Sequence, residues 1–252
     1  MRVLSEAEAL SKPQVAALQA RLRACEAQSI VAFAVDTFPG RIALTSSFGA
    51  ESAVLLHLAS RVAPHVPVLF LDTGKLFPET IAYRETIVGR LGLTAVRIVS
   101  PDPSKLKEDD PSGYLWSVDP DRCCAIRKVE PLSQVLTEFS AWITGRKRFQ
   151  GGSRSGLPAF ERDGRHVKVN PLAAWSEADI ENYLVEHNLP RHPLAARGYR
   201  SIGCTHCTSP TLPGEDARAG RWRNKGKTEC GIHRHRQVAV DGVDATLGGL
   251  AP

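Results

Sequence analysis

Five of the six cysteines have a spacing that suggests metal chemistry beside nucleophilic chemistry. Cys123 and Cys124 are adjacent, Cys204 and Cys207 form a Cys-x-x-Cys pair much later, and Cys230 stands alone. Structural zinc sites usually separate paired ligands by two to four residues, so adjacent cysteines suit zinc poorly. An iron–sulfur cluster offers separate iron atoms to its ligands and relaxes that demand. The pattern favours four metal-bound thiolates and a separate nucleophile; the simpler alternative is a buried apolar pair and a stray zinc or redox half-site.

Positive charge is concentrated in two windows of the sequence. Residues 144–168 hold seven Lys or Arg against two acids, and residues 218–236 hold seven against one. The whole chain carries only +5, so the remainder is net negative. Two local basic clusters on an acidic body predict a site for a compact polyanion, because a nucleic-acid surface needs positive charge spread along a groove. We therefore expect no nucleic-acid partner.

Length and composition are those of a globular protein. The chain has 252 residues, of which 42% are hydrophobic and 23% charged, and no apolar run approaches the roughly 18 residues of a membrane span. The N-terminus carries acids and no apolar signal core. We expect a cytoplasmic protein without a membrane partner, one domain over residues 1–236, and a flexible tail over 237–252. In a reducing compartment the cysteines are metal ligands or reactive thiols, and we expect Cys25 to be buried in a helix.

Apolar periodicity predicts an α/β fold. Short apolar runs of strand length alternate with amphipathic segments of helical spacing, and Ser176 with Asp179 forms an N-terminal capping pattern. This order is typical of a mostly parallel, twisted sheet with helices on both faces. The expected strands are 41–45, 67–71, 95–99 and 141–144, and the expected helices are 13–36 (one or two), 52–62, 78–91 and a helix starting after Ser176.

Two strand ends carry residues suited to a nucleotide. Ligands of such sheets bind beyond the carboxyl ends of the strands, where a tight loop offers backbone N–H groups to a phosphate. The segment 46–52, with two serines and a glycine before a helix, is a candidate phosphate loop. Leu71-Asp72-Thr73-Gly74 ends the next strand and is a candidate contact for a ribose or a base. The alternative for both segments is an ordinary turn.

These segments together resemble the assimilatory adenylyl-sulfate reductases, which are related to the phosphoadenylyl-sulfate reductases within the adenine-nucleotide alpha-hydrolase-like proteins. The likeness spans about residues 41–233. Its motifs are Ser46-Ser47-Phe48-Gly49, Leu71-Asp72-Thr73-Gly74 with Phe77-Pro78-Glu79-Thr80, Cys123-Cys124 with Lys128, Thr144-Gly145-Arg146, Val169-Asn170-Pro171-Leu172, the segment from Arg197 to Cys207, Gly214-Glu215-Asp216 through Arg218 to Trp222, and Lys227-Thr228-Glu229-Cys230-Gly231-Ile232-His233.

The resemblance implies a cofactor and a set of site residues. It implies a [4Fe–4S] cluster on Cys123, Cys124, Cys204 and Cys207, and catalysis by Cys230 and His233 on a mobile segment over 218–236. The substrate contacts that it implies are Ser46, Ser47, Phe48, Gly49, Leu71, Asp72, Gly74, Lys128, Arg146, Arg154, Arg218 and Arg221. The loop 146–154 departs from the family's usual Arg-x-x-Gln-Ser pattern, so which of its arginines meets the substrate is left open.

The resemblance also implies a reaction, the reduction of adenylyl sulfate to sulfite with AMP leaving. Cys230 would attack the sulfur as a thiolate, which nearby cations favour, and Lys227, His233 and His235 flank it in sequence. We expect an external thiol donor, thioredoxin or glutaredoxin, to release sulfite from the S-sulfonate on Cys230.

Three alternative functions share part of this pattern. In the first alternative, the enzyme carries out the same reaction on the 3′-phosphorylated nucleotide, alone or together with adenylyl sulfate. An ATP-using RNA thiolation enzyme would have Ser-Gly-Gly-x-Asp-Ser in the phosphate loop, where this chain has Phe48 and Glu51. A zinc-ribbon nucleic-acid binder fits poorly with adjacent cysteines and no aromatic stripe.

Overall fold

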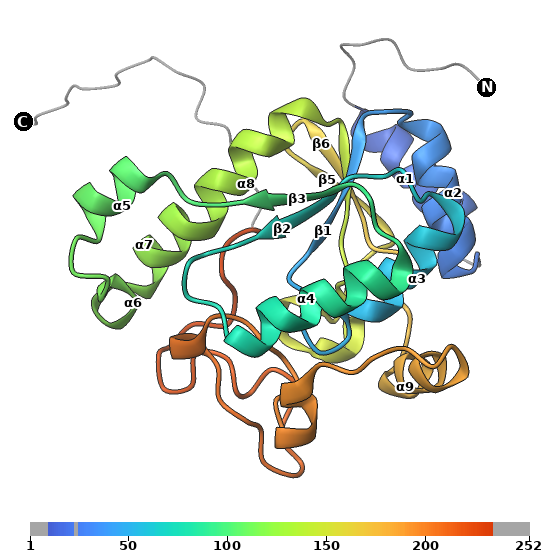
Figure 1. Cartoon of the computed structure of the whole chain (residues 1–252). Helices are drawn as coiled ribbons and strands as arrows, with labels where there is room; N and C mark the ends of the chain where they lie inside the picture. The colour runs from blue at the N-terminus through green and yellow to red at the C-terminus, as the bar shows by residue number, and fades with distance from the viewer. Residues whose placement is uncertain (1–9, 23–24, 234–252) are drawn as a thin grey trace, which may run out of the picture.

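A six-stranded sheet forms the centre of the protein in a computed structural model that describes residues 10–22 and 25–233. Its strands lie in the order β3-β2-β1-β4-β6-β5 (Figure 1). They are β1 (Ile42–Ser46), β2 (Val68–Leu71), β3 (Val96–Val99), β4 (Ala141–Ile143), β5 (Phe160–Asp163) and β6 (His166–Val169). All neighbours pair in parallel except β5 and β6. The mostly parallel sheet predicted from the sequence is confirmed.

Helices cover both faces of this sheet because its strands are apolar on both sides. Along β1, Ile42 and Leu44 pack into the larger core, whereas Ala43 faces the smaller one. The same alternation in β4 sends Trp142 to the smaller core. Parallel strands that are buried on both faces read as continuous apolar runs, which is why the sequence identified β1, β2 and β4.

The larger core is covered by helices from the first half of the chain and by α9. These are α1 (Lys12–Arg21), α2 (Ala27–Thr37), α3 (Ser52–Val62), α4 (Pro78–Leu91) and α9 (Glu177–Glu186). Helix α9 begins at the predicted cap, where the Ser176 side chain accepts from the Asp179 N–H and the Asp179 carboxylate accepts from the Ser176 N–H. This reciprocal pair satisfies two N–H groups that a helix start leaves without partners.

The smaller core lies under a run of short helices that the sequence analysis did not identify. They are α5 (Pro103–Asp109), α6 (Leu115–Val118), α7 (Pro120–Cys124), the π-helical turn η1 (Ala125–Val129), α8 (Glu130–Val135) and the 3-10 turn η2 (Leu136–Glu138). Leu132 and Leu136 pack on Leu69 and Trp142 of the sheet. The β5–β6 hairpin was also missed, because charged residues interrupt its apolar pattern.

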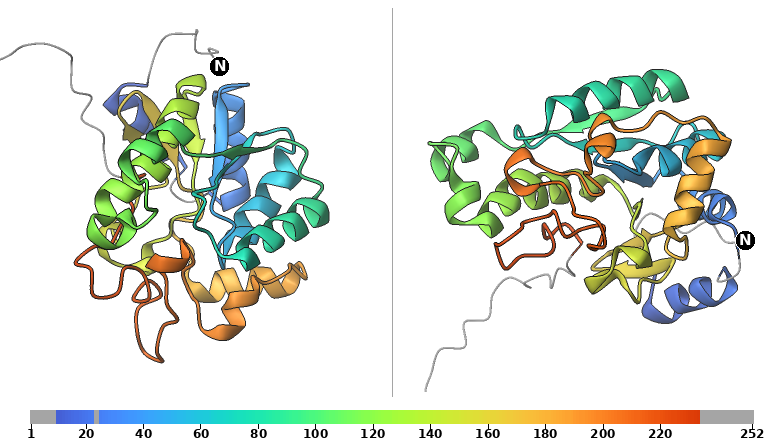
Figure 2. Two further views of the ribbon diagram at one scale, coloured as in Figure 1. Left: turned by 60° about the vertical axis from the view of Figure 1, so that its left-hand side comes forward. Right: turned by 90° about the horizontal axis from the view of Figure 1, so that it is seen from below.

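Residues 190–233 cross the sheet at the end where β1 and β4 finish (Figures 1 and 2). This part of the chain holds only two short 3-10 turns, η5 (Pro193–Arg197) and η6 (Thr205–Cys207), in agreement with the loss of regular periods seen in the sequence. Two more such turns, η3 (Arg148–Gln150) and η4 (Gly152–Arg154), follow β4. The expected tail over 237–252 and His235 lie outside the described residues.

Two further points concern expectations about helices and membranes. Cys25 is exposed, because it lies in the turn between α1 and α2, so its expected burial was wrong. Within the described ranges, no helix combines the length and the apolar character that a membrane crossing requires.

The loop between β1 and α3 depends on an unusual backbone conformation at Phe48. Its φ is 45°, in the left-handed region that side chains other than glycine rarely adopt. The ring is fully buried and packs edge-to-face on Phe70 with 5.4 Å between the ring centroids. Burial of the Phe48 ring therefore offsets the strain of its backbone. The loop turns sharply enough for Ser46, Ser47 and Gly49 to face the end of the sheet.

The strain at Phe48 predicts that the Ala and Gly variants at this position differ in stability in the reverse of the usual order. Phe48→Ala loses the ring and keeps the strain, at a cost of about 3–5 kcal/mol in the free energy of unfolding. Phe48→Gly loses the same ring but adopts a positive φ freely, so we expect it to be as stable as Phe48→Ala or more stable. Chemical denaturation of both variants measures the difference. Phe70→Ala and Phe70→Gly are the matched control, and there Gly is expected to be the less stable; the same order at position 48 would contradict the role of strain.

Candidate active site

A cleft opens at the carboxyl ends of β1 and β4, where the strand order changes direction. Its cavity volume is about 210 Å³. The loops after β1 and β4 line it on two sides, and residues of the 200–233 segment close it. Ligands of open α/β sheets bind at such a switch point. Eleven of the predicted site residues line the cleft: Ser46, Ser47, Gly49, Leu71, Lys128, Arg146, Arg154, Arg218, Arg221, Cys230 and His233.

The loop after β1 supplies small groups and close backbone approach. The Ser46 hydroxyl accepts the N–H of Phe48 at 3.1 Å, which fixes the turn. A Cβ at Gly49 would lie 3.5 Å from the Ile202 carbonyl oxygen and 3.3 Å from the Ser47 hydroxyl, so glycine lets the closing segment pack tightly here. The predicted phosphate loop thus faces the cleft, with the start of α3 behind it.

Three predicted contacts do not line the cleft. The side chain of Phe48 belongs to the core. The Asp72 carboxylate accepts the N–H of Gly74 at 3.0 Å, and Gly74 has a φ of 67°, so these two residues form a local turn. Thr73 belongs to the candidate segment 71–74 but was not among the individual substrate contacts; it lines the cleft, and its hydroxyl lies 3.2 Å from the Cys204 sulfur. No local signal identifies this contact, since the two residues are 131 positions apart.

The four paired cysteines are buried together beside the cleft. Cys123 and Cys124 end α7, and the Cys204–Cys207 turn is held against the loop after β2 by the bond from the Thr205 N–H to the Lys75 carbonyl, at 2.9 Å. All four sulfurs line a small second cavity. Trp222 packs on Cys124, Cys204 and Cys207 and completes this apolar group. The pairing of Cys123-Cys124 with Cys204 and Cys207 predicted from the sequence is therefore seen in space.

The donor set consists of four cysteine thiols, which both iron–sulfur clusters and zinc take as ligands. The described side chains contain no group of three or more Cys, His, Asp or Glu already gathered to hold one metal ion. A cluster presents separate iron corners, so its ligands stand farther apart than those around zinc. Burial raises the pKa of Cys123 to about 11, and the neighbouring Cys124 adds to the shift. Four buried thiols are costly to ionise together unless positive charge is placed among them.

Lys128 brings positive charge to these sulfurs. The π-helical turn Ala125–Val129 follows the cysteine pair directly and buries both Arg127 and Lys128. Burial opposes the charge of Lys128, but the Cys204 and Cys230 sulfurs outweigh it and raise the pKa of the ammonium. Burial likewise would raise the pKa of Cys204, and Lys128 with the Thr73 hydroxyl reverses that shift. Lys128 therefore lies between the four-cysteine group and Cys230.

Arg127 is a second buried cation that the sequence analysis missed. Its Nη2 donates to the Asp110 carboxylate at 2.6 Å, and its Nη1 donates to the Thr73 carbonyl at 2.9 Å. Asp110 thus neutralises Arg127, whereas Lys128 makes no ion pair with a carboxylate among the residues described. The two adjacent cations have different roles: Arg127 ties the helix to the loop after β2, and Lys128 faces the cleft.

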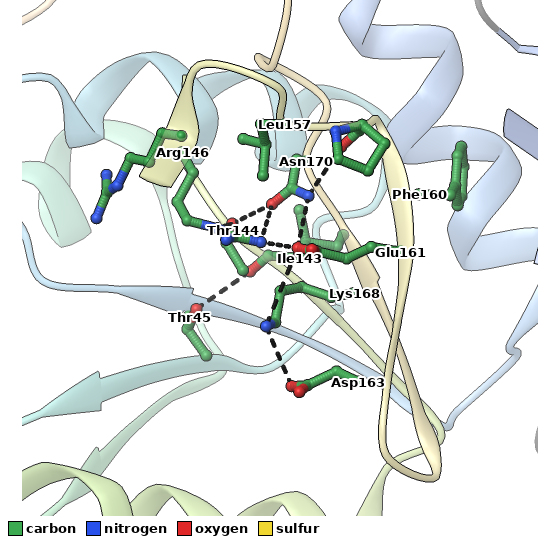
Figure 3. Close-up of polar contacts among 12 residues, drawn as sticks. Thr45, Ile143, Thr144, Arg146, Leu157, Phe160, Glu161, Asp163, Lys168 and Asn170 are labelled. Carbon is green, nitrogen blue, oxygen red and sulfur yellow. Dashed lines mark hydrogen bonds and ion pairs between the residues drawn. The ribbon is translucent and has the colours of Figure 1, made fainter. Parts of the chain in front are cut away.

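Arg146 is held from behind by a polar network (Figure 3). Its guanidinium donates to the Asn170 amide oxygen at 3.1 Å and pairs with Glu161. Asn170 also accepts from the Thr144 hydroxyl at 2.6 Å and donates to the Pro158 carbonyl at 3.0 Å. The Thr144-Gly145-Arg146 and Val169-Asn170-Pro171-Leu172 motifs therefore meet across β4 and β6, and they fix the guanidinium at the cleft wall.

Arg154 and Arg218 share one carboxylate. Glu229 accepts from Arg154 Nε at 2.7 Å and from Arg154 Nη2 at 3.1 Å, and its second oxygen lies 3.2 Å from Arg218 Nη2. Burial would raise the pKa of Glu229, but the bonds and charge of Arg154 hold it below its usual value. Burial and then the charge of Arg154 lower the pKa of Arg218 to about 10.

Arg221 lies between the closing segment and the cysteine group. Its guanidinium carbon is 4.3 Å from the centroid of the Trp222 ring, a cation–π contact. A Cβ at Gly203 would overlap Arg221 Nη2 at 2.3 Å, so the guanidinium occupies the space that glycine leaves. Arg221 pairs with no carboxylate in the part of the chain that the structure describes. Its charge helps to lower the pKa of Glu229 without a direct ion pair.

Cys230 and His233 reach the cleft from the same segment. Cys230 is partly exposed and contacts the edge of the four-cysteine group. His233 is half-buried and stacks on Trp142, with 5.6 Å between ring centroids and 7° between planes. Lys168 lies on the same indole at 4.8 Å. Burial, and then the charges of Arg146 and Lys168, lower the pKa of His233 well below its ordinary value. His233 is thus a neutral imidazole, and the positive charge near Cys230 comes from Lys128 and the arginines.

Comparison with known proteins identifies relatives over most of the chain. Residues 41–210 match the phosphoadenosine phosphosulfate reductase domain. An adenosine 5′-phosphosulfate reductase of Chelativorans sp. (strain BNC1) is 50% identical over 218 residues, covering 86% of this chain and 89% of the relative. One from Mesorhizobium japonicum is 49% identical over 212 residues, covering 84% and 83%. The crystal structure of phosphoadenylyl-sulfate reductase from Candida auris in a phosphate complex superposes with a TM-score of 0.69 at 29% identity, covering 79% of this chain and 98% of that one.

The environment of His233 predicts its titration. Because the folded pKa lies well below 6.5, the folded state excludes a proton that the unfolded state binds below pH 6.5, so His233 stabilises the fold above that pH and this contribution is lost as the pH falls. NMR of ¹⁵N-labelled histidine should show a neutral His233 ring at pH 6. Lys168→Met removes one of the responsible charges and should raise this pKa, whereas Lys105→Met, at the surface, should not. A wild-type ring that titrates near 6.5 would contradict the assignment.

Proposed function

The chain belongs to the phosphoadenosine phosphosulfate reductase family, and we propose that it reduces adenylyl sulfate to sulfite with release of AMP, through Cys230. One observation carries the proposal. A single unpaired cysteine shares a cleft with Lys128, Arg218 and Arg221, next to a small-residue loop at a nucleotide-binding switch point. This arrangement suits a nucleophilic attack on an anionic sulfur centre joined to a nucleotide.

The reaction proceeds by two exchanges at sulfur. The Cys230 thiolate attacks the sulfate sulfur, the bond from that sulfur to the bridging oxygen breaks, and AMP departs with the bond electrons. Cys230 is left as an S-sulfonate. A thiolate of an external dithiol then attacks the Cys230 sulfur and expels sulfite, and the second thiol of the donor resolves the mixed disulfide and frees Cys230. Sulfur(VI) becomes sulfur(IV), and the dithiol, of the thioredoxin or glutaredoxin type, becomes a disulfide.

The cations of the cleft balance the negative charge of the substrate and of the leaving AMP. Adenylyl sulfate carries negative charge on adjacent phosphate and sulfate groups, which guanidinium forks bind well in a partly dry site. Lys128 and Arg221 are not neutralised by a described carboxylate, so they are the first candidates for the sulfate end. The Ser46–Gly49 loop is the candidate for the nucleotide phosphate, and Leu71 lies at the nucleoside side of the cleft.

His233 is suited to orientation and to holding a proton rather than to carrying charge. Its flat contact with Trp142 fixes the ring plane, and its buried Nδ1 has no hydrogen-bond partner among the described residues. A neutral ring can donate one hydrogen bond and accept another. We assign His233 to the substrate side of the cleft, where its free nitrogen meets an oxygen of the bound anion.

A [4Fe–4S] cluster on Cys123, Cys124, Cys204 and Cys207 completes the proposal. When bound, the cluster would hold the four thiolates in place and would fix the helix turn that carries Lys128, whose ammonium is the positive charge beside them. The residues of this chain carry out the bond changes at Cys230 themselves. Support comes from the donor set: four buried thiols line one cavity next to the unpaired cation Lys128.

The function is tested by sulfite release. Anaerobic protein supplied with thioredoxin and its reducing system should release sulfite from adenylyl sulfate, and the 3′-phosphorylated nucleotide in a parallel assay distinguishes the alternative substrate. Without reductant, mass spectrometry should find an added SO₃ group on the peptide containing Cys230, which thioredoxin removes. Sulfite from the 3′-phosphorylated nucleotide alone would change the substrate, and an adduct on another cysteine would change the nucleophile.

A pair of substitutions separates the metal ligands from the nucleophile. Cys230→Ser should retain about four iron and four sulfide per chain and lose nearly all turnover, because an alcohol of high pKa does not replace a thiolate. Cys204→Ser should lose iron and sulfide, since it removes a buried ligand. Iron and acid-labile sulfide analyses of both variants measure the partition. Loss of iron from Cys230→Ser, or zinc in place of iron and sulfide in the wild type, would contradict it.

A further inference from the structure

We propose that Trp116 and His206 form an aromatic cover over the solvent side of the four-cysteine cavity, and that this cover limits the access of oxidants and chelators to the metal centre held there. The inference rests on the proposed function in taking the four paired cysteines as metal ligands. It assigns a role to two residues that lie outside the cleft and take no part in the bond changes at the sulfate.

The cysteine cavity lies close to the protein surface. All four cysteines are at most 8% exposed, yet His206, which directly precedes Cys207, is exposed. The helix α6, whose Trp116 also lines the cavity, carries Tyr114 and Val118, which are 64% and 79% exposed. A single layer of side chains, and not a thick part of the fold, therefore keeps water from the sulfurs on this side.

Trp116 and His206 make up this layer. Both residues line the cavity together with the four cysteines. The indole and the imidazole are stacked, with 4.2 Å between ring centroids and 9° between ring planes. Contact between two flat rings removes apolar area from water and adds a favourable interaction of the rings themselves. The stack also joins the helix before the adjacent cysteines to the Cys204–Cys207 turn, so it connects the two parts of the chain that supply the ligands.

Lys225 holds the indole from the 190–233 segment, which runs beside α6 (Figure 1). Its ammonium lies 4.6 Å from the centroid of the Trp116 ring and donates to the Trp116 carbonyl at 3.0 Å. The cation–π contact favours one position of the ring, and the hydrogen bond fixes the backbone that carries it. The Lys225 N–H in turn donates to the carbonyl of Trp222, which packs on three of the cysteines.

Asp110 ties the cover to the helix that carries the adjacent cysteines. Its carboxylate accepts the N–H of Leu115 at 2.9 Å, at the start of α6, and accepts from Arg127 at 2.6 Å. Arg127 lies in the turn that follows the cysteine pair, and it also lines the cavity. One buried carboxylate therefore sets the position of α6 relative to the cysteines, and the fold places the Trp116 ring over the cavity.

The two sides of the cavity meet different requirements. On one side Lys128 lines both the cavity and the cleft, and the cleft must admit an anion. Trp116 and His206 do not line the cleft. A thiolate-bound metal centre is lost when its thiolates are oxidised or when a chelator reaches the metal. An aromatic cover on the side that no substrate enters protects the centre against both without hindering turnover.

Metal release tests the cover without any substrate. Anaerobic holoenzyme is exposed to air or to EDTA, and visible absorbance and released iron, or zinc if zinc is the bound metal, are followed over time. Trp116→Ala should release metal roughly tenfold faster or more, because it removes the stacked ring and its buried area. Trp116→Phe keeps a flat ring and should recover most of the protection. His206→Ala leaves the indole in place and should speed release by less, about two- to fivefold.

Two control variants separate covering from a general loss of stability. Val118→Ala changes an exposed side chain of the same helix, and Trp175→Ala removes an indole that packs on the larger core. Both should release metal at the wild-type rate. The proposal is overturned if Trp116→Ala also keeps that rate, or if Trp175→Ala speeds release as much as Trp116→Ala does.

The same measurements keep the cover and the proposed function apart. Metal release does not depend on turnover, so inactivity toward adenylyl sulfate would count against the proposed function and leave the release rates to decide the role of the cover. Protein that contains no metal after anaerobic purification would overturn both the metal assignment and this inference.

Discussion

Holding several cations together in one small cleft is the constraint on which this structure depends. Like charges at such distances repel one another, and the repulsion grows as water is removed. The protein places Lys128 and Arg146 on regular elements or directly after them, and it brings Arg154, Arg218 and Arg221 from loops. When no anion is bound, each of these charges must be stabilised by the protein itself. Most of the polar contacts around the cleft supply that stabilisation.

The counter-charges are distributed unevenly, and the unevenness has a functional meaning. Arg146 has Glu161 and Asn170 behind it, and Arg127 has Asp110. Glu229 serves both arginines nearest to it. Lys128 and Arg221, by contrast, are stabilised by softer partners, the cysteine sulfurs and the Trp222 ring. A site that binds an anion reversibly needs some cations whose charge is not yet satisfied, and these two fulfil that condition among the described residues.

The separation of four cysteines from the fifth follows from where the chain is rigid. Cys123 and Cys124 end a helix that continues through the π turn into α8, and Cys204 and Cys207 are tied to the loop after β2. Cys230 lies in a segment without regular structure, attached by side-chain ion pairs. Under the proposed function, cofactor ligands gain from fixed positions, whereas a nucleophile that meets both a buried substrate and an external thiol donor gains from reversible attachment.

Sequence alone determined the features that depend on local patterns. The strands β1, β2, β3 and β4 and the helices α1, α2, α3, α4 and α9 were predicted because apolar spacing and a capping serine act within a few residues of one another. The grouping of cysteines and the two basic windows were equally visible, since they are properties of composition and spacing. Eleven of the site residues expected from the motifs line one cleft in the structure. The short charged hairpin of β5 and β6 escaped, because its pattern acquires meaning only when β6 pairs with β4.

Tertiary structure decided which way the side chains point and which distant residues they meet. The Phe48 side chain points into the core because a positive φ redirects it, and the residue type does not indicate that conformation. Thr73 meets Cys204, and Arg154 meets Glu229, through contacts that span 131 and 75 positions. Arginines in a basic window look alike in sequence. Only the fold separates a guanidinium neutralised by a buried carboxylate from one that is free to bind an anion, because charge pairing depends on distances of a few ångströms that sequence separation does not fix.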